Sequence, residues 1–327
     1  MLATHAIDPR HAAGLRRARS AASSLATVLA FSSTACSTAP PSPLPPAPHV
    51  PDAPNGRLFV GDSPYGKVVV HQTGSRRCLS FSDDTGEQTC IDMDRPGRVV
   101  HEYVAFLSVG LAFLPRSPNI AMIGLGGGAA ARMFLGHDPA ARMDVVELNP
   151  LVVKVAQEYF NVAPSERLRL HTADGRAFMQ QSTASWDMIV LDAFGDDFIP
   201  FPLATAEFLS LLTLRLPADG VVVSNLWYRN DRLFRAMLAT YRSVFPSVFV
   251  FRGVQSGNAI VVATSASPAP TCENVLARTR TDAPRYQFPF DFVAPARQCE
   301  PAAVYDNTDV PVLHDDRRAE FDALGRL

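Results

Sequence analysis

A glycine cluster between an apolar run and a helix-like segment places the strongest constraint on the fold. It lies in 121-AMIGLGGGAAARMF-134. Glycine permits a tight turn and lets the backbone approach a ligand closely. Gly124, Gly126 and Ala129 have the spacing G-x-G-x-x-A of a dinucleotide-binding turn, but the loop alone equally fits another nucleoside, or a structural turn without a ligand. The stretch therefore predicts a strand, a turn and a helix of an open α/β sheet.

Strands and helices alternate along the middle of the chain. Segments of helical periodicity separate five apolar runs typical of buried strands, at 119–124, 143–148, 168–173, 187–192 and 220–227. Such alternation predicts a parallel, doubly wound sheet. Two further strands, 247–253 and 258–265, have a short glycine-containing connection and are predicted to form a hairpin. An antiparallel hairpin that closes a parallel sheet is typical of class I methyltransferase-like folds and unusual in dinucleotide-binding domains.

Short strands separated by turn residues precede this region and predict a small antiparallel β-domain between Gly56 and about Met93. A helix is predicted over 97–114, because apolar residues recur there at helical spacing. The tail is rich in Pro, Arg and Asp, and we predict no element in it. The predicted domains are an N-terminal β-domain plus connecting helix at 56–116, a Rossmann-like nucleoside-binding domain at 117–265 and a C-terminal tail at 266–327.

Residues 1–36 have the pattern of an export signal. Basic residues around Arg16 are followed by an uncharged run, 20–35, with the length of a signal-peptide apolar region. The run ends at Cys36 behind small residues, as in a bacterial lipoprotein cleavage site, which makes Cys36 a candidate lipid anchor. Residues 37–55 are proline-rich and are expected to act as a linker. We expect an exported, periplasmic or membrane-anchored lipoprotein; a start assigned too early would instead mean a cytoplasmic protein.

With Cys36 set aside, four of the five cysteines admit two local disulfides. Cys78 and Cys90 flank a polar turn, and Cys272 and Cys299 bracket a C-terminal segment. Two disulfides would suit an oxidising compartment, whereas the alternative is four buried thiols. The sequence has no CxxC or Cys/His cluster that indicates a metal site. The net charge of −2, without a basic run interleaved with aromatic residues, argues against a nucleic-acid partner.

Carboxylates follow three successive predicted strands. Glu147 ends the second strand, Asp174 follows the third and Asp192 ends the fourth. Ligands of open α/β sheets bind outside the carboxyl ends of the strands, so we expect these side chains to meet in one crevice. There Glu147 would accept hydrogen bonds from ribose hydroxyls, and Asp174 would accept one from the exocyclic amine of adenine. The set favours an adenosine moiety with a neighbouring cation.

The joint order of these motifs resembles the spermidine synthase family, the polyamine aminopropyltransferases, and within it the bacterial spermidine-synthase-like branch. The resemblance covers the block from Tyr65 to Val262. It is carried by 63-SPYG-66, Gln88, 101-HE-102, 122-MIGLGGG-128, 145-VVELNP-150, 173-ADGRAF-178, 191-LDAFGDDFIPFPLATAEF-208 and 220-GVVVSN-225. It implies decarboxylated S-adenosylmethionine as donor, a small polyamine such as putrescine or spermidine as acceptor, and no metal. It also admits a homodimer.

The resemblance further implies the roles of single residues. An aliphatic amine has a pKa near 10 and is mostly protonated at neutral pH, so a carboxylate must orient it and accept its proton. Asp192 would be that catalytic residue, with Asp196 as its partner carboxylate. The implied contacts are, for the donor, Gly124, Gly126, Gly128, Glu147, Asp174 and Gly175, and, for the acceptor, Tyr65, Gln88 and Glu102.

Three positions depart from the family pattern. Gly127 stands where the family has an Asp that contacts the aminopropyl end of the donor, Val100 where a Tyr is usual, and Gly66 where a Gln is expected. Two alternatives therefore stay open. One is a methyltransferase that uses intact S-adenosylmethionine, which Gly127 favours, and the other is a non-catalytic exported protein that binds polyamine or nucleoside. The closing hairpin and Asp174 argue against an NAD-dependent enzyme.

Overall fold

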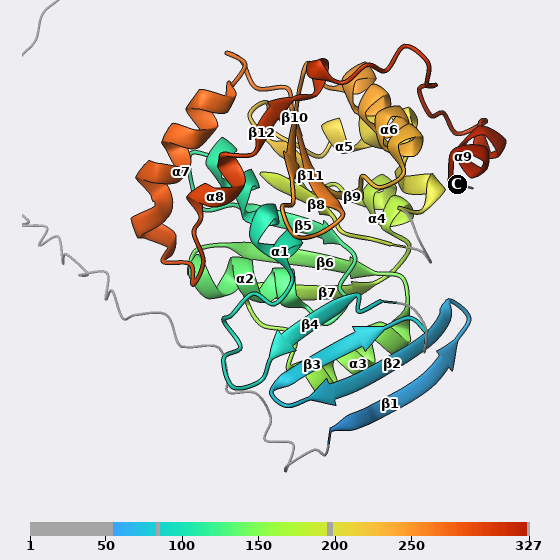
Figure 1. Ribbon diagram of the computed structural model, residues 1–327, viewed down its shortest axis with the longest axis vertical. Coiled ribbons are helices and arrows are strands. Elements are labelled where there is room, and N and C mark those ends of the chain that lie inside the picture. Colours follow the sequence, from blue (N-terminus) through green and yellow to red (C-terminus); the bar gives the residue numbers. More distant parts are fainter. Residues whose placement is uncertain (1–54, 83–85, 195–198, 326–327) are drawn as a thin grey trace, which may run out of the picture. The chain divides into compact units, whose positions relative to one another are not determined.

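The computed structural model describes residues 55–82, 86–194 and 199–325, which form two sheets with surrounding helices (Figure 1). The signal-like segment with Cys36, nearly all of the proline-rich linker, and Asp196 lie outside the described residues. The export prediction therefore stays a prediction. Among the described helices, none is long and apolar enough to cross a membrane.

The smaller sheet is antiparallel and lies at the N-terminal side of the described chain. Its strands occur in the order β1 (Gly56–Ser63), β2 (Gly66–Thr73), β3 (Arg76–Ser80) and β4 (Thr89–Asp92) (Figure 1). Val68 and Val70 of β2 and Leu79 of β3 are fully buried and join the same hydrophobic cluster as the larger sheet. Burial of this shared cluster holds the two sheets together.

The larger sheet has eight strands in the order β12-β10-β11-β9-β8-β5-β6-β7. Its parallel strands are β5 (Asn119–Ile123), β6 (Arg142–Glu147), β7 (Leu168–Thr172), β8 (Met188–Leu191) and β9 (Val221–Trp227). The antiparallel strands β10 (Ser247–Arg252), β11 (Asn258–Thr264) and β12 (Cys299–Pro301) complete it. The predicted fold class is confirmed. Because chain order reverses on either side of β5, the ligand crevice is expected at the carboxyl end of β5.

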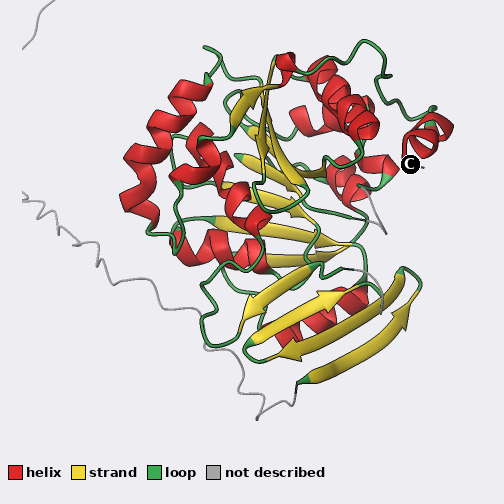
Figure 2. Ribbon diagram, viewed as in Figure 1, coloured by secondary structure: helices red, strands yellow, loops and turns green. Residues whose placement is uncertain are grey.

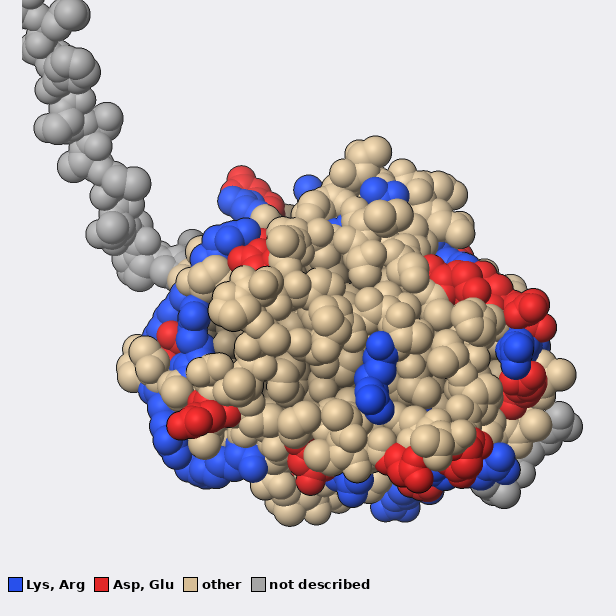
Figure 3. Space-filling model, turned by 90° about the horizontal axis from the view of Figure 1, so that it is seen from above, with Lys and Arg blue, Asp and Glu red and all other residues tan. Residues whose placement is uncertain are grey.

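Helices cover both faces of this sheet (Figure 2). Ile120 and Met122 of β5 pack with α2 (Ala129–His137), α3 (Pro150–Phe160) and α7 (Cys272–Tyr286). Ala121 and Ile123 point to the opposite face, with α4 (Gly175–Gln181), α5 (Ala206–Thr213) and α6 (Asp231–Val244). The two-residue period of a buried strand therefore splits the apolar residues into two cores. Viewed from above, the surface carries Lys/Arg and Asp/Glu side chains interspersed around a largely uncharged centre (Figure 3).

The helix predicted over 97–114 is shorter in the structure than predicted, and its second part is a 3₁₀ helix. The α-helix α1 covers Glu102–Leu107 and continues as a 3₁₀ helix, Ser108–Phe113. A Cβ added at Gly110 would come within 2.6 Å of Val223 and 2.8 Å of Met188. The backbone at Gly110 thus lies directly against the sheet, an approach that periodicity alone does not reveal.

Residues 266–325, for which we predicted no element, contribute helices and an edge strand. They form α7, α8 (Val293–Ala296), β12 and α9 (Arg318–Gly325). A disulfide joins Cys272, at the start of α7, to Cys299 in β12, with Cα atoms 5.6 Å apart. A second disulfide joins Cys78 of β3 to Cys90 of β4, which are paired across the two strands. Of the two alternatives for the cysteines, the structure has the disulfides.

Candidate active site

A cavity of about 1310 Å³ opens at the carboxyl ends of the parallel strands. It is large enough for a nucleoside together with a second small molecule. Both sheets contribute to its walls. Of the residues predicted to form the site, those that line the cavity are Tyr65, Gln88, Gly124, Gly126, Glu147, Asp174, Gly175 and Asp192. The structure therefore brings together the three strand-end carboxylates, as the sequence predicted.

The glycine loop forms the floor of the cavity between β5 and α2. Gly124 has a φ of +100°, and a Cβ there would collide with the backbone carbonyl of Asp192. Gly124 N–H donates to the carbonyl of Val146 at 2.8 Å, which joins the ends of β5 and β6. Gly128 does not line the cavity; it sits in the left-handed region with a φ of +73° and starts α2. Glycine is thus required for the turn itself.

Glu147 holds this loop in place from the end of β6. Its carboxylate accepts hydrogen bonds from the backbone N–H of Leu125 at 3.0 Å and of Asn149 at 2.9 Å. Burial raises the pKa of Glu147, and these backbone donors oppose that rise. Glu147 is partly buried and its side chain lines the cavity, next to the glycine loop that it holds.

Asp174 lies beside Glu147 at the start of α4. Its Oδ1 atom accepts from the backbone N–H of Ala177 at 2.8 Å, which makes Asp174 the N-cap of the helix. The side chain is exposed toward the cavity that it lines. Its other carboxylate oxygen, Oδ2, makes no hydrogen bond to another described residue, which leaves it open to an amine donor.

Asp192 follows β8 and faces the middle of the cavity. Burial raises the pKa of this carboxyl group to about 7, and a hydrogen bond from Asn225 Nδ2 to its Oδ1 at 2.9 Å opposes the rise. A carboxyl group that titrates near neutrality can take up and release a proton at physiological pH. Such a perturbed group in a cavity is the usual mark of a functional carboxylate.

Tyr103, which the sequence analysis missed, stands next to Asp192. Its hydroxyl donates to the backbone carbonyl of Gln88 at 3.3 Å. Burial, together with the negative charge of Asp192, raises the pKa of Tyr103 well above its usual value, so the hydroxyl keeps its proton. Tyr103 directly follows the 101-HE-102 motif, and this position could have indicated a site residue. Its helical spacing with apolar residues instead predicts a core position.

Glu102, an expected acceptor contact, does not line the cavity. Its Oε1 accepts from the backbone N–H of Val254 at 3.0 Å, and its Oε2 accepts from those of Gln255 at 2.8 Å and Ser256 at 2.9 Å. The carboxylate therefore binds the turn between β10 and β11. Tyr65, in the turn between β1 and β2, is 55% exposed and contributes to the rim of the cavity.

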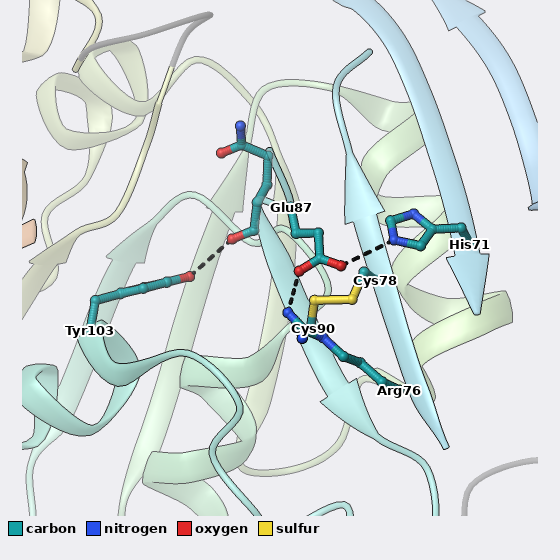
Figure 4. The surroundings of a disulfide bond; sticks show 7 residues. His71, Arg76, Cys78, Glu87, Cys90 and Tyr103 are labelled. Carbon is teal, nitrogen blue, oxygen red and sulfur yellow. Dashed lines mark hydrogen bonds and ion pairs between the residues drawn. A yellow bond between two sulfur atoms is a disulfide. The ribbon is translucent and has the colours of Figure 1, made fainter. Parts of the chain in front are cut away.

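The wall formed by β4 adjoins a disulfide (Figure 4). Glu87 and Gln88 precede β4 and line the cavity, and Glu87 forms a hydrogen bond with His71 and an ion pair with Arg76. Within the described part of the chain, two side-chain groups are close enough to hold a metal, His71–Cys78–Glu87 and Glu87–Cys90–His101. Each includes a half of the Cys78–Cys90 disulfide, and metal sites bind cysteine as a thiolate. The oxidised pair thus does not supply those ligands.

At Gly127 the loop leaves no room for a side chain. A Cβ there would come within 2.7 Å of Thr89 Cγ2 and 2.8 Å of Phe160 Cδ1. Thr89 starts β4 and Phe160 ends α3, and both are buried. Their packing excludes the Asp that the family pattern has at this position.

Comparison with known proteins agrees with this geometry. Residues 98–269 match the family described as the spermine/spermidine synthase domain. A polyamine aminopropyltransferase of Vibrio vulnificus is 37% identical over 205 residues, which cover 61% of this chain and 68% of that protein.

Solved structures share the fold. A probable spermidine synthase from Corynebacterium glutamicum has a TM-score of 0.63 at 20% identity, over 80% of this chain and 97% of that one. Human methyltransferase-like protein 13, in complex with SAH, has a TM-score of 0.54 at 23% identity, over 64% of this chain and 97% of that one. From the family match and the Vibrio relative, the chain belongs to the spermine/spermidine synthase family.

Proposed function

We propose that the protein transfers an aminopropyl group from decarboxylated S-adenosylmethionine to a polyamine such as putrescine. The observation that carries the proposal is Asp192, a carboxyl group with a pKa of about 7 in a cavity that it shares with Glu147 and Asp174. The names of the relatives, polyamine aminopropyltransferases, support the same reaction class.

The donor would lie on the glycine loop, with its ribose hydroxyls on Glu147 and its adenine amine on Asp174. The acceptor nitrogen attacks the methylene carbon beside the sulfonium. The new C–N bond forms as the C–S bond breaks, and methylthioadenosine leaves with the bonding electron pair. An ammonium nitrogen has no lone pair, so the acceptor must lose one proton before it attacks, and the positive charge then passes from sulfur to nitrogen.

Ionised Asp192 would orient the acceptor ammonium and accept that proton. Transfer of this proton to Asp192 frees the nitrogen lone pair for the attack, and a carboxyl group with a pKa of about 7 can take up and release a proton near neutral pH. The Tyr103 hydroxyl and the Gln88 side chain would bound the amine on the N-terminal side. The proposal needs no metal for any of these steps.

A second candidate is methyl transfer from intact S-adenosylmethionine. The observation that favours it is Gly127, where Thr89 and Phe160 exclude the Asp that would contact the donor's aminopropyl end. Intact S-adenosylmethionine carries a carboxylate. Because position 127 has no Asp side chain, that carboxylate would meet no like charge there.

The donor pair decides between the two candidates. Purified protein is incubated with putrescine and either decarboxylated or intact donor, and the nucleoside products are separated by chromatography. We expect methylthioadenosine from the decarboxylated donor and no S-adenosylhomocysteine from the intact one. Release of S-adenosylhomocysteine with a methylated product would favour methyl transfer, and no turnover with either donor would reject both.

A further inference from the structure

The hydrogen-bond chain behind Asp192 points to a positioning residue that the sequence motifs do not contain. Asp192 Oδ1 accepts from Asn225 Nδ2 at 2.9 Å, and Asn225 Oδ1 accepts from Asn258 Nδ2 at 2.9 Å. Asn225 lies in β9 and is 2% exposed, and Asn258 begins β11, which pairs with β9. The three side chains therefore form one continuous polar row at the cavity.

When Asp192 is ionised, the hydrogen bonds of this row can be donated in one direction only, from Asn258 to Asn225 and from Asn225 to Asp192. An ionised carboxylate can only accept, so Asn225 must turn its NH₂ group toward Asp192. The carbonyl oxygen of Asn225 then faces Asn258, which must donate. If the Asn225 amide rotated by half a turn, its oxygen would face the carboxylate and its NH₂ group would face the NH₂ group of Asn258. The hydrogen bond from Asn258 therefore supports the orientation in which Asn225 donates to Asp192.

The position of Asn258 depends in turn on Glu102. The Glu102 carboxylate accepts the three backbone N–H groups of Val254, Gln255 and Ser256, as described above. Gly253 N–H donates to the carbonyl of Asn258 at 2.8 Å and closes the same turn. Glu102 is the first residue of α1, between His101 and Tyr103, which line the cavity. The Glu102 carboxylate thus links the start of α1, beside the cavity-lining His101 and Tyr103, to the β10–β11 turn.

We propose that Asn258 and Glu102 are positioning residues that act on Asp192 through Asn225. Glu102 holds the β10–β11 turn, the turn places Asn258, and Asn258 locks the Asn225 amide with its NH₂ group on the Asp192 carboxylate. A hydrogen bond donated to the charged form favours that form, so the chain keeps Asp192 ionised at a lower pH than burial alone would permit. The proposal rests on the proposed function for the role of Asp192, but the chain itself can be measured without turnover.

The test removes the hydrogen-bond donor at Asn258 in two variants, of which Asn258→Asp keeps the size of the side chain. In Asn258→Asp the NH₂ group becomes an acceptor, which favours the wrong orientation of Asn225, and Asn258→Ala removes the donor without adding charge. The carboxyl titration of Asp192 is followed by ¹³C NMR of aspartate-labelled protein, with Asp192→Asn to assign the signal. We expect an upward shift of about one pH unit or more in Asn258→Asp and a smaller upward shift in Asn258→Ala.

The matched control is Asn55→Asp. It adds the same charge outside the cavity and keeps the side-chain acceptor that binds Gly74 N–H. We expect the Asp192 titration to be unchanged in this variant. Titration of Asp192 at its wild-type midpoint in Asn258→Ala would overturn the proposal, because the charge added in Asn258→Asp can raise the pKa of Asp192 by repulsion alone. This measurement uses no substrate. If the protein failed to transfer aminopropyl groups, the proposed function would be refuted, but the titration would still show whether Asn258 acts on Asp192.

Glu102→Gln separates positioning from direct contact with the amine. If Glu102 bound the acceptor, loss of its charge would raise the KM for putrescine at unchanged kcat. The positioning role predicts a KM within about twofold of the wild type, a lower kcat near pH 7 and an upward shift of the acid limb of the pH–rate profile. A raised KM without a change in the pH profile would contradict the role assigned to Glu102.

Discussion

Among single residues, Asp192 is the one on which the proposed aminopropyl transfer most depends, as an ionisable base. We expect Asp192→Asn to lower turnover by at least about 100-fold, because the amide cannot accept the proton. Nucleoside affinity should stay nearly constant, since Glu147 and Asp174 are untouched. Turnover measured with saturating donor, together with methylthioadenosine affinity, checks both statements. Turnover close to that of the wild type would remove Asp192 from this role.

The same variant should gain stability at alkaline pH. The folded-state pKa of about 7 lies above the value near 3.9 of an unfolded Asp, so the folded protein binds the proton more tightly. Ionisation above pH 7 therefore lowers the free energy of unfolding, by at most about 4 kcal/mol, and this loss fades as the pH falls toward 4. Urea unfolding should show Asp192→Asn more stable than the wild type at pH 8 and nearly equal at pH 4. Equal stability at both pH values would mean that Asp192 has an ordinary pKa.

Individual residues of the site were predictable where a strand end and a residue type coincide. Glu147, Asp174 and Asp192 each follow an apolar run, and the geometry of a parallel sheet then brings them together. Asn225 and Asn258 were not predicted, because their link depends on the register between β9 and β11. Glu102 was predicted to contact the acceptor amine, but its carboxylate binds the β10–β11 turn. Its neighbours in sequence do not reveal this, because its partners are about 150 residues further along the chain.

At the scale of the element, the Cys78–Cys90 disulfide positions one wall of the cavity. Cys90 directly follows Thr89, which contacts the glycine loop, and Glu87 and Gln88 precede it. We expect replacement of Cys78 and Cys90 by Ser to raise the KM for putrescine severalfold, because the β4 wall loosens. Steady-state kinetics at a fixed donor concentration measure this effect.

The Cys272–Cys299 disulfide provides the matched control. It lies between α7 and β12, and neither cysteine lines the cavity. It closes a segment with a sequence separation of 27, against 12 for the other pair, so removing either is expected to cost about 3 kcal/mol, with the greater loss for Cys272–Cys299. The double Ser variant at 272 and 299 should therefore lose at least as much stability while its KM stays at the wild-type value. If the KM for putrescine rose in both double Ser variants in proportion to their loss of stability, the Cys78–Cys90 disulfide would have no local role at the cavity.

Element types were predictable where periodicity is strong, and they were missed where distant contacts decide. The buried strands and the closing hairpin follow directly from apolar runs bounded by turn residues. After α1, the 3₁₀ helix Ser108–Phe113 lies against the sheet at Gly110, a contact with residues distant in the sequence. In the tail, β12 is three residues long and pairs with β10 almost fifty residues earlier, so its own sequence carries no strand pattern.

At the scale of the whole molecule, the two sheets share one core and meet at one cavity. The glycine loop, Glu147, Asp174 and Asp192 come from the larger sheet, and Gln88, Thr89 and Tyr103 come from the smaller sheet and α1. This division is what a two-substrate transfer requires, because a nucleoside on one wall can face an amine on the other. The arrangement also places Asp192 between the two walls.

The proposed nucleoside site can be tested directly by a crystal structure of the protein soaked with methylthioadenosine. We expect the adenine amine to contact Asp174, the ribose hydroxyls to contact Glu147, and the methylthio group to point toward Asp192. A nucleoside bound outside this cavity, or oriented with its sulfur away from Asp192, would contradict the account.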